Sequence, residues 1–385
     1  MRKLAIVTTH PIQYYAPLFQ LLNSRGRINI KVFYTLGKPG KPRNDPGFGK
    51  PVSWDIPLLE GYDFEWIQNT AAKPGSDHFC GVVNPGVTDR IKEWAPDAIL
   101  IYGWAYHGHL QVMRFFKNKV PVYFRGDSTL LNEKPGLKQL FKTLFLRWVY
   151  RHVDHAFYVG QHNKAYFKKY GLKEHQLSFA PHAIDNKRFE EKRTDEVKEL
   201  HASLNLNAED ILVLFAGKLE PVKNVATLLS AFINLDRENL HLLLVGNGVN
   251  EPELKSMAHA SSYSSNIHFL DFKNQSYMPV LYQSADLFCL PSKSETWGLS
   301  VNEAMACSKA ILVSDKVGCA PDLVKEGLNG AVFEAGSVPD LSATLDRITG
   351  SKNQLGELGR RSALMIGHWD FFHIAKEIEH KVLNG

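Results

Sequence analysis

Short runs of strand-forming residues alternate with helical patterns along the whole of this 385-residue chain. Such alternation is typical of βα units, which assemble into a parallel sheet covered by helices. The runs expected to form strands are 3–9, 28–35, 98–103, 120–126, 155–160 and 176–182 in the first half, and 211–217, 241–246, 267–272, 287–292, 309–315 and 330–335 in the second. The pattern predicts the α/β class, with a separate parallel sheet in each half.

The length is about twice that of a usual single domain, and a composition of 44% apolar and 22% charged residues is ordinary for a globular protein. A polar, charged stretch follows the last apolar run of the first half, and we interpret it as a linker with the domain boundary near Asp185. We therefore expect a first domain over residues 1–185. Residues 36–55 are rich in Gly and Pro and are expected to form a long loop, of the kind that is usually functional or mobile.

Several classes of protein are disfavoured by the composition. The four cysteines show no CxxC spacing, so neither a disulfide framework nor a zinc site is expected. The first apolar run ends at Thr8 and is too brief for a signal peptide. No uncharged apolar stretch reaches the roughly 18 residues needed to span a bilayer. We expect a soluble protein of a reducing cytoplasm.

Two lysines follow a strand that ends at Gly217. Lys218 and Lys223 lie just before a helical pattern that begins near Val225. Two ammonium groups and the N–H groups of a helix start, at the carboxyl end of a parallel sheet, suit an anionic ligand such as a diphosphate. The alternative is that both lysines are solvated loop residues, as most lysines are.

A Gly-x-Gly turn, Gly246 to Gly248, follows the next strand. As a nucleotide-binding pattern it is weak, because the third glycine is missing and any strand-end turn in an α/β fold favours glycine. The simple turn is the favoured interpretation, and Gly246 is retained with Gly217 among the candidate nucleotide contacts.

The stretch PSKSETWGLSVNEAMA, residues 291–306, places Glu295 in a loop and Glu303 in the first turns of a helix, with Gly298 between them. A glycine at this point lets backbone N–H groups face a phosphate. If the segment were helical throughout, the two carboxylates would be about 12 Å apart, too far to share one proton transfer. They could hold opposite ends of an extended ligand. The alternative is a capping box, in which Ser300 and Glu303 only satisfy backbone groups.

Together these motifs resemble family 4 retaining glycosyltransferases. The two glutamates match the family's E-x7-E motif, AGKLEPVKN matches its phosphate-binding Arg/Lys pair, and the run from VGNG to SADLFCLPS follows the expected order. The resemblance covers most of the second half. The first half is similar more loosely, in strand order and in YVGQHN and FAPHAID. HWDFFHIAKEIEHKVL is similar to the family's closing helix.

The resemblance implies a GT-B fold, in which two Rossmann-like domains with parallel sheets face each other across a cleft. It implies a nucleotide-sugar domain over 186–367, an acceptor domain over 1–185 and a returning helix over 368–385. By position, Glu303 would bind ribose hydroxyls and Glu295 would lie by the transferred sugar. Lys218 and Lys223 would neutralise the leaving diphosphate, and Trp297, Gly298 and Leu299 would offer backbone contacts.

Three departures from the family pattern affect the expected site. Lys218 stands where many members have Arg, so a bidentate fork is lost. The family's Gly-Gly loop after the first strand is replaced by THPIQYYAP, where side chains such as His10, Gln13 and Tyr14 would take its place. A histidine expected after 120–126 is absent, because the chain reads Arg125-Gly126-Asp127-Ser128 there.

Asp127 or Arg125 is therefore the candidate for contact with the donor sugar. His107 and His109, after another strand end, compete with them, although either histidine could instead cap or flank a helix. We expect a metal-independent enzyme with no cofactor, since no DxD triad occurs in the chain.

Residues 114–151 carry nine Lys and Arg against Asp127 and Glu133, a larger excess than the net +5 of the chain. On a helical wheel, Leu137, Leu140, Phe141, Leu144 and Trp148 form an apolar stripe. We expect a buried packing helix with basic edges, with an anionic membrane or a polyprenyl-diphosphate acceptor as the alternative partner.

The sequence predicts a retaining glycosyltransferase that moves a sugar from a nucleotide-diphosphate-sugar to a hydroxyl of a glycan or a lipid-linked acceptor, in surface polysaccharide or glycolipid assembly. The expected location is the cytoplasm, with possible attachment to the inner membrane face, and no nucleic acid is expected as partner. A sugar-nucleotide epimerase of the same fold and a non-catalytic nucleotide-sugar-binding protein stay as alternatives. A dinucleotide-dependent oxidoreductase is disfavoured because no GxGxxG follows the first strand.

Overall fold

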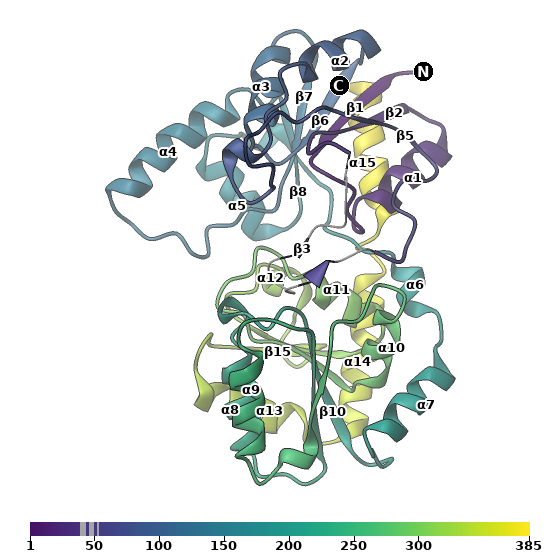
Figure 1. Ribbon diagram of the computed structural model, residues 1–385, viewed down its shortest axis with the longest axis vertical. Coiled ribbons are helices and arrows are strands. Elements are labelled where there is room, and N and C mark those ends of the chain that lie inside the picture. The colour runs from purple at the N-terminus through teal and green to yellow at the C-terminus, as the bar shows by residue number, and fades with distance from the viewer. Residues whose placement is uncertain (39–43, 46–49, 52–53) are drawn as a thin grey trace. The chain divides into compact units, whose positions relative to one another are not determined.

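The computed structural model describes residues 1–38 and 54–385, together with the backbone of the short pairs 44–45 and 50–51. The chain divides into two compact units (Figure 1). The first comprises Met1–Lys41, Pro57–His182 and Asp370–Gly385, and the second comprises Pro42–Ile56 and Ala183–Trp369. The boundaries expected at residues 185 and 367 lie within a few residues of these divisions.

The end of the long loop belongs to the second unit, although the sequence placed it in the first domain. Trp54 packs against Phe272 with ring centroids 6.3 Å apart, and the Asp55 carboxylate accepts a hydrogen bond from the Ser276 backbone N–H at 3.1 Å. A two-residue antiparallel pair, β3 (Asn44–Asp45) with β4 (Lys50–Pro51), interrupts the expected loop. The rest of that loop lies outside the described residues.

The first unit contains a seven-stranded parallel sheet in the order β5-β2-β1-β6-β7-β8-β9. Its strands are β1 (Lys3–Thr8), β2 (Asn29–Tyr34), β5 (Asp63–Trp66), β6 (Ala98–Tyr102), β7 (Val122–Arg125), β8 (His155–Tyr158) and β9 (Leu177–Phe179). The six strands expected in this half are confirmed. The edge strand β5 was missed, because its four residues carry two acids and show no apolar run.

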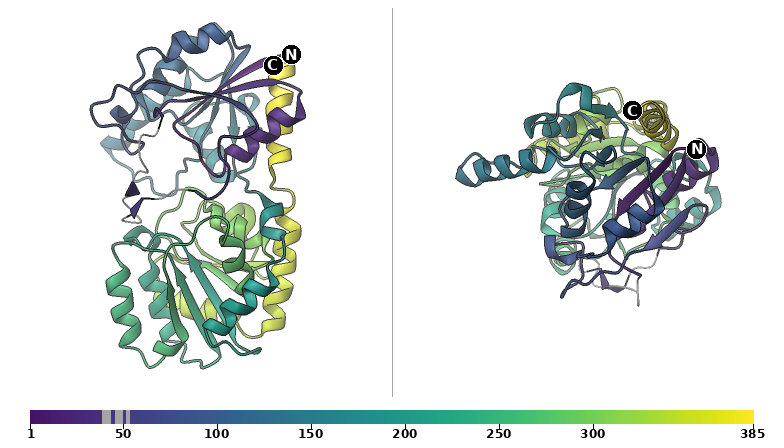
Figure 2. Two further views of the ribbon diagram at one scale, coloured as in Figure 1. Left: turned by 45° about the vertical axis from the view of Figure 1, so that its right-hand side comes forward. Right: turned by 90° about the horizontal axis from the view of Figure 1, so that it is seen from above.

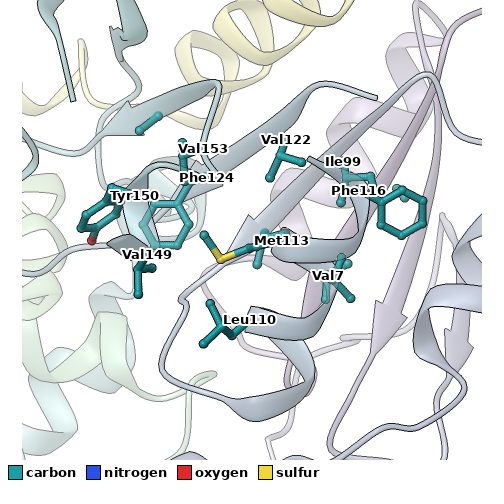
Figure 3. Close-up of a cluster of buried hydrophobic side chains, with 14 of the residues drawn as sticks. Val7, Ile99, Leu110, Met113, Phe116, Val122, Phe124, Val149, Tyr150 and Val153 are labelled. Atoms are coloured by element: carbon teal, nitrogen blue, oxygen red, sulfur yellow. The ribbon is translucent and has the colours of Figure 1, made fainter. Parts of the chain in front are cut away.

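Helices cover both faces of this sheet. They are α1 (Ala16–Arg25), α2 (Val87–Trp94), α3 (His107–Phe116), α4 (Leu137–Tyr150), α5 (Gln161–Lys169) and α15 (Phe371–Asn384), with the short 3-10 turns η1 (Phe79–Gly81) and η2 (Glu174–Gln176). The core on one face is formed by side chains of the central strands and of α2 to α5 (Figure 3). Strand β6 is buried throughout and β1 is buried after its first residue, which explains the continuous apolar runs of the sequence, since both faces of a parallel sheet are covered.

The C-terminal helix α15 packs beside α1, so the two ends of the chain lie in the same unit (Figure 2). Glu379 on α15 is fully buried and accepts two hydrogen bonds from Arg25, at 2.7 and 2.9 Å, and one from Arg27 at 3.3 Å. Arg25 also stacks on Phe372. One carboxylate thus joins α15 to the end of α1.

The second unit contains a six-stranded parallel sheet in the order β12-β11-β10-β13-β14-β15. Its strands are β10 (Ile211–Ala216), β11 (Leu240–Val245), β12 (Ile267–Leu270), β13 (Leu287–Leu290), β14 (Ala310–Ser314) and β15 (Gly330–Phe333). All six coincide with the expected runs, and two parallel sheets of Rossmann type are confirmed.

The helices of the second unit form two layers, with α8, α9 and α13 on one side of the sheet and α7, α10, α11 and α14 on the other. Their bounds are α6 (Asn186–Glu190), α7 (Thr194–Ser203), α8 (Val225–Ile233), α9 (Glu251–His259), α10 (Met278–Ser284), α11 (Leu299–Ala306), α12 (Ala320–Leu323), α13 (Val338–Ile348) and α14 (Lys352–Ile366), with the 3-10 turns η3 (Pro221–Lys223) and η4 (Ser264–Asn266). The expected helix starts at Val225 and Leu299 are confirmed.

The expectation that the apolar stripe of α4 is buried is wrong. Leu137, Leu140, Phe141, Leu144 and Trp148 are all exposed, and the helix instead buries Leu146, Val149 and Tyr150. Val149 and Tyr150 point into the core of the first unit (Figure 3). The wheel identified the stripe correctly, but the smaller opposite face is the one that packs.

The Glu379→Gln substitution should destabilise the first unit by about 2–4 kcal/mol. It removes the buried negative charge that pairs with the guanidinium groups of Arg25 and Arg27. A thermal melt followed by circular dichroism measures the effect. The matched control is Glu377→Gln on the same helix, where the side chain is partly exposed. Equal melting temperatures for the two variants would contradict the role of Glu379.

Candidate functional site

The strand order of the second sheet fixes where a ligand is expected. The chain starts at β10 in the middle of the sheet, winds outward through β11 and β12, and then returns to the other side of β10 with β13. In open parallel sheets, ligands bind at the carboxyl ends of the strands where the winding reverses. The carboxyl ends of β10 and β13 carry the two segments selected from the sequence, 217–223 and 291–299.

Backbone and side-chain hydrogen bonds tie the loops at this edge to one another. The Lys293 N–H donates to the Val222 carbonyl at 2.8 Å. The buried Asn224 side chain donates to the Pro291 carbonyl at 3.3 Å, and Thr227 in turn donates to the Asn224 side chain at 2.9 Å. The loops after β10 and β13 therefore form one connected structure.

Lys223 and Glu295, selected from segments more than seventy positions apart, form an ion pair through Lys223 Nζ and Glu295 Oε2. Both side chains keep some exposure, 23% and 18%. Lys218 follows Gly217 on the same loop and is also part-exposed. The arrangement places cationic charge at the carboxyl end of β10, next to a carboxylate from the neighbouring loop.

Gly298 is the N-cap of α11, with a φ of 96° that L side chains rarely adopt. A Cβ there would lie 3.0 Å from Leu290 and 3.1 Å from Val317, so only glycine fits without movement of its neighbours. The first backbone N–H groups of a helix favour an anion, and at this helix start the Val301 N–H already donates to the Gly298 carbonyl at 2.9 Å, which leaves Leu299 and Ser300 as the candidate donors. The proposed capping box is wrong, because the helix starts one residue before Ser300 and its cap makes no side-chain hydrogen bond.

Glu303 lies on α11 and is almost fully buried, with 2% exposure. Its Oε2 accepts a hydrogen bond from the Tyr282 hydroxyl at 2.7 Å. Tyr282, on α10, was missed by the sequence reasoning, and only its placement in three dimensions shows that it orients Glu303. The assignment of Glu303 as a ribose contact stays a prediction.

Trp297 has its side chain in the interior of the unit. Its indole N–H donates to Asn302 at 2.9 Å, and its ring lies against Trp369 with centroids 5.3 Å apart. Its carbonyl accepts from the Cys319 N–H at 3.0 Å. The side chain of Trp297 and its carbonyl are thus engaged within the unit, and the expected backbone contact of this residue with the donor stays a prediction.

The loop after β14 is a further part of the site that the sequence reasoning missed. The Gly318 N–H donates to the Glu295 carbonyl at 3.1 Å, and a Cβ at Gly318 would lie 1.9 Å from the Thr296 carbonyl oxygen. Ser314 donates to the Ser292 carbonyl at 2.5 Å. The sequence DKVGCAP carried a signal in its glycine, which permits this close approach.

Gly217 and Gly246 lie against each other at the ends of β10 and β11. The Gly217 N–H donates to the Val245 carbonyl at 3.0 Å, and a Cβ at Gly246 would lie 2.0 Å from the Gly217 carbonyl oxygen. Gly246 also has a φ of 131°. These contacts give both glycines a packing role, in keeping with the favoured interpretation of Gly246 as a simple turn residue.

The first unit has its own reversal of winding, between β1 and β6. The ring of Tyr15, from the turn before α1, lies tilted against Tyr102 with centroids 4.6 Å apart, and it is stacked on His182 with centroids 6.4 Å apart. Burial raises the pKa of Tyr102 to about 12 and, together with Arg125, lowers that of His182 to about 4. The sequence reasoning missed all three and selected His10, Gln13 and Tyr14 from this turn.

Arg125 ends β7 and is buried, with its guanidinium donating to the carbonyls of Ala180 and Pro181 at 2.8 and 2.7 Å. Because the guanidinium is already bonded to two backbone carbonyls, a direct contact of Arg125 with the sugar is disfavoured. Asp127, two residues later, is part-exposed. Its negative charge raises the pKa of His182, while burial of the imidazole lowers that pKa. Asp127 is the better placed of the two for a ligand.

Both ring nitrogens of His109 are hydrogen-bonded within the first unit. Its Nδ1 bonds the Gly103 carbonyl at 2.8 Å and therefore carries the proton, so Nε2 accepts from the Thr35 hydroxyl at 2.8 Å. Burial lowers its pKa to about 4, so the ring is neutral. His107, the first residue of α3, is exposed and lies beside Phe79. The two histidines thus flank a helix start, as the alternative interpretation expected.

Residues 196–363 match the family model of glycosyl transferases group 1. The D-inositol 3-phosphate glycosyltransferase of Nocardia farcinica is 26% identical over 216 residues, which are 54% of this chain and 47% of that protein. Its counterpart in Mycobacterium sp. (strain KMS) is 31% identical over 152 residues, 38% of this chain and 34% of that protein. The chain thus spans less than half the length of these two curated relatives.

Solved structures resemble almost the whole chain. Sucrose-phosphate synthase from Thermosynechococcus elongatus aligns with a TM-score of 0.74 and 16% identity, covering 99% of this chain and 98% of that one. HepE of Anabaena, solved in complex with UDP and glucose, aligns with a TM-score of 0.73 and 17% identity over 100% of both chains. At these identities the likeness concerns the fold, and the expected GT-B class of two Rossmann-like domains is confirmed.

The close approach of Gly246 to Gly217 can be tested with the Gly246→Ala substitution. It should cost at least about 2 kcal/mol more stability than Gly336→Ala, because both glycines have positive φ but only a Cβ at Gly246 meets backbone. Thermal melts of the two variants isolate the clash from the shared backbone strain. If both variants melt at the same temperature, the packing described at this edge of the sheet is incorrect.

Proposed function

We propose that the chain is a retaining, metal-independent glycosyltransferase that moves a sugar from a nucleotide-diphosphate-sugar to a hydroxyl of a glycan or lipid-linked acceptor. The observation that carries the proposal is the joint position of Lys223, Glu295 and the N-terminus of α11 at the winding reversal of the second sheet. The match of residues 196–363 to the group 1 glycosyl transferase family supports it.

The charges at the carboxyl edge of the second sheet can stabilise a nucleoside diphosphate as it leaves. Negative charge grows on the leaving diphosphate as the glycosidic bond breaks, so groups that stabilise it act in the transition state. In the proposal, Lys218 and Lys223 supply cationic charge, and the N–H groups that follow Gly298 supply hydrogen bonds. These groups would take the part that a divalent metal takes in metal-dependent transferases.

Glu295 is the proposed contact for the transferred sugar. Its ion pair with Lys223 holds the carboxylate beside the loop that follows β10. A bound diphosphate would compete for the same ammonium group. Glu303, held by Tyr282, is proposed to accept hydrogen bonds from the ribose hydroxyls. The two carboxylates would then hold different parts of one donor molecule.

In the first unit, Asp127 is the proposed polar contact for a sugar or an acceptor hydroxyl, since Arg125 and His109 are engaged with their own unit. The cluster of Tyr15, Tyr102 and His182 lines the same edge of the sheet. Tyr102 has a buried hydroxyl for which no hydrogen-bond partner occurs among the described residues. An unsatisfied buried hydroxyl calls for an explanation, and a bound hydroxyl is the partner that we propose for it.

The relatives suggest where to begin with substrates. HepE has been crystallised with UDP-glucose, and the curated relatives are named for D-inositol 3-phosphate. A screen should therefore start with UDP-glucose as donor and extend to GDP- and ADP-linked sugars. Retention is tested by the anomeric configuration of the product in proton nuclear magnetic resonance, and metal independence by turnover in the presence of a chelator. Epimerised donor without transfer would favour an epimerase.

The Lys223→Ala substitution should weaken binding of the best nucleoside diphosphate by roughly tenfold or more, because it removes a charge-assisted hydrogen bond and leaves Glu295 facing the phosphates alone. Isothermal titration calorimetry measures the affinity. The control is Lys198→Ala, which removes a lysine from an exposed ion pair with Asp195 on α7. Equal affinities of Lys223→Ala and the control would exclude this loop as the diphosphate site.

A further inference from the structure

An exposed apolar surface is concentrated on one helix of the first unit. We define the α4 face as the side chains of Leu137, Leu140, Phe141, Leu144, Phe145 and Trp148, which are between 37% and 78% exposed. Scattered apolar residues are normal on a protein surface, but a contiguous group on one element marks an interaction site. The glycosyl-transfer chemistry proposed above makes no use of this face.

The α4 face has the geometry of an interfacial helix. At about 100° per residue, its six side chains fall within an arc of about 140° around the helix axis. The buried residues Leu146, Val149 and Tyr150 lie on the opposite side and fix the helix to the core. Figures 1 and 2 show α4 projecting from the side of the first unit. The apolar arc therefore faces outward along the length of the helix.

Basic side chains border the α4 face along both edges. On the same wheel, Lys138 lies about 20° outside the arc beyond Phe145 on one edge. Arg147 lies about 20° outside the arc beyond Leu140 on the other edge. Both are exposed, as are Lys134 before the helix and Arg151 after it. Long basic side chains at the borders of an apolar arc can reach anionic groups while their stems stay against apolar surface.

Acidic groups near the α4 face are neutralised within the protein. The helix itself contains no Asp or Glu. Glu133, in the loop before it, is 9% exposed and is paired with Lys142 at 2.8 Å and Lys169 at 2.7 Å. The border of the face thus presents positive charge to its surroundings.

We propose that the α4 face docks on an anionic lipid surface, with its apolar side chains in the interfacial region and Lys138 and Arg147 at the level of the headgroups. An amphipathic helix of this kind lies in the membrane plane. Its fourteen residues extend about 21 Å, less than the roughly 30 Å of a bilayer core. Among the described residues no helix is long and apolar enough to cross a membrane.

A lipid surface fits the charge pattern better than a second copy of the chain does. A two-fold pair through the α4 face would bring the same patch of each copy together. The basic borders, including Lys138 and Arg147, would then face one another and repel. Anionic headgroups complement both borders at once, and an extended surface accommodates the whole length of the helix.

Vesicle flotation of the full chain tests the proposal. The wild type should float with vesicles of phosphatidylcholine mixed with phosphatidylglycerol at low salt, and should bind less at high salt and to phosphatidylcholine alone. The Phe141→Ser, Leu144→Ser double variant should lower the apparent partition constant by about tenfold or more. The Lys138→Glu, Arg147→Glu variant should lower it by a similar factor on anionic vesicles.

The matched control is the Val249→Ser, Leu364→Ser double variant in the second unit, where both side chains are 76% exposed. It removes comparable apolar surface and should float as the wild type does. Trp148 gives a second readout, since its fluorescence should shift to the blue with anionic vesicles and the Trp148→Phe variant should lose that shift. This readout uses the wild-type fold and does not depend on the stability of the serine variants.

Three results would overturn the proposal. These are a wild type that stays unbound to anionic vesicles at low salt, serine variants of α4 that float like the control, and a wild type whose self-association in sedimentation is abolished by the same variants. Affinity for nucleoside diphosphates should be equal in the wild type and the α4 variants. Loss of flotation with unchanged nucleotide affinity therefore separates this proposal from the proposed transfer activity.

Discussion

The hydrogen bonds between the loops after β10 and β13 are the contacts on which the candidate site depends. Asn224 bridges from one loop to the Pro291 carbonyl, and Lys293 returns a bond to Val222. Because these loops follow adjacent strands at the winding reversal, the register of β10 with β13 determines how they meet. These hydrogen bonds hold together the two loops from which Lys223 and Glu295 form their ion pair.

Glycines make the same edge possible by allowing backbone segments to approach closely. Gly246 lies against Gly217, and Gly318 lies against the carbonyl of Thr296. Gly298 supplies the left-handed turn from which α11 begins. Together they allow the strand ends and loops around the start of α11 to pack without a clash, so the position of this helix N-terminus depends on glycines.

The alternation of strand and helix patterns was sufficient to predict two parallel sheets, because buried parallel strands read as continuous apolar runs. The candidate site of the second unit could also be predicted from the sequence, since Lys223, Glu295 and Gly298 lie at strand ends that the sheet topology brings together. The polar residues at the sheet edge of the first unit were harder to predict. Arg125 and His109 looked available in the sequence, but their partners are carbonyls and a hydroxyl that pattern reasoning does not locate.

The error on α4 has a different physical origin. A helical wheel identifies an apolar stripe but carries no information about which side of the helix meets the core. In α4 the core takes Leu146, Val149 and Tyr150, and the larger stripe is left outside with basic borders. The first unit thus combines a polar edge of its sheet, around Asp127, with an apolar helix surface.

Hydrogen exchange of the full chain with saturating UDP, GDP or ADP is the most direct test of the central claim that the second unit binds a nucleoside diphosphate at its winding reversal. We predict slower exchange in peptides covering 217–224 and 294–303 with at least one of these nucleotides, because the ligand would accept hydrogen bonds from the N–H groups after Gly298. Unchanged exchange in both peptides with all three nucleotides, or protection confined to the first unit, would contradict it.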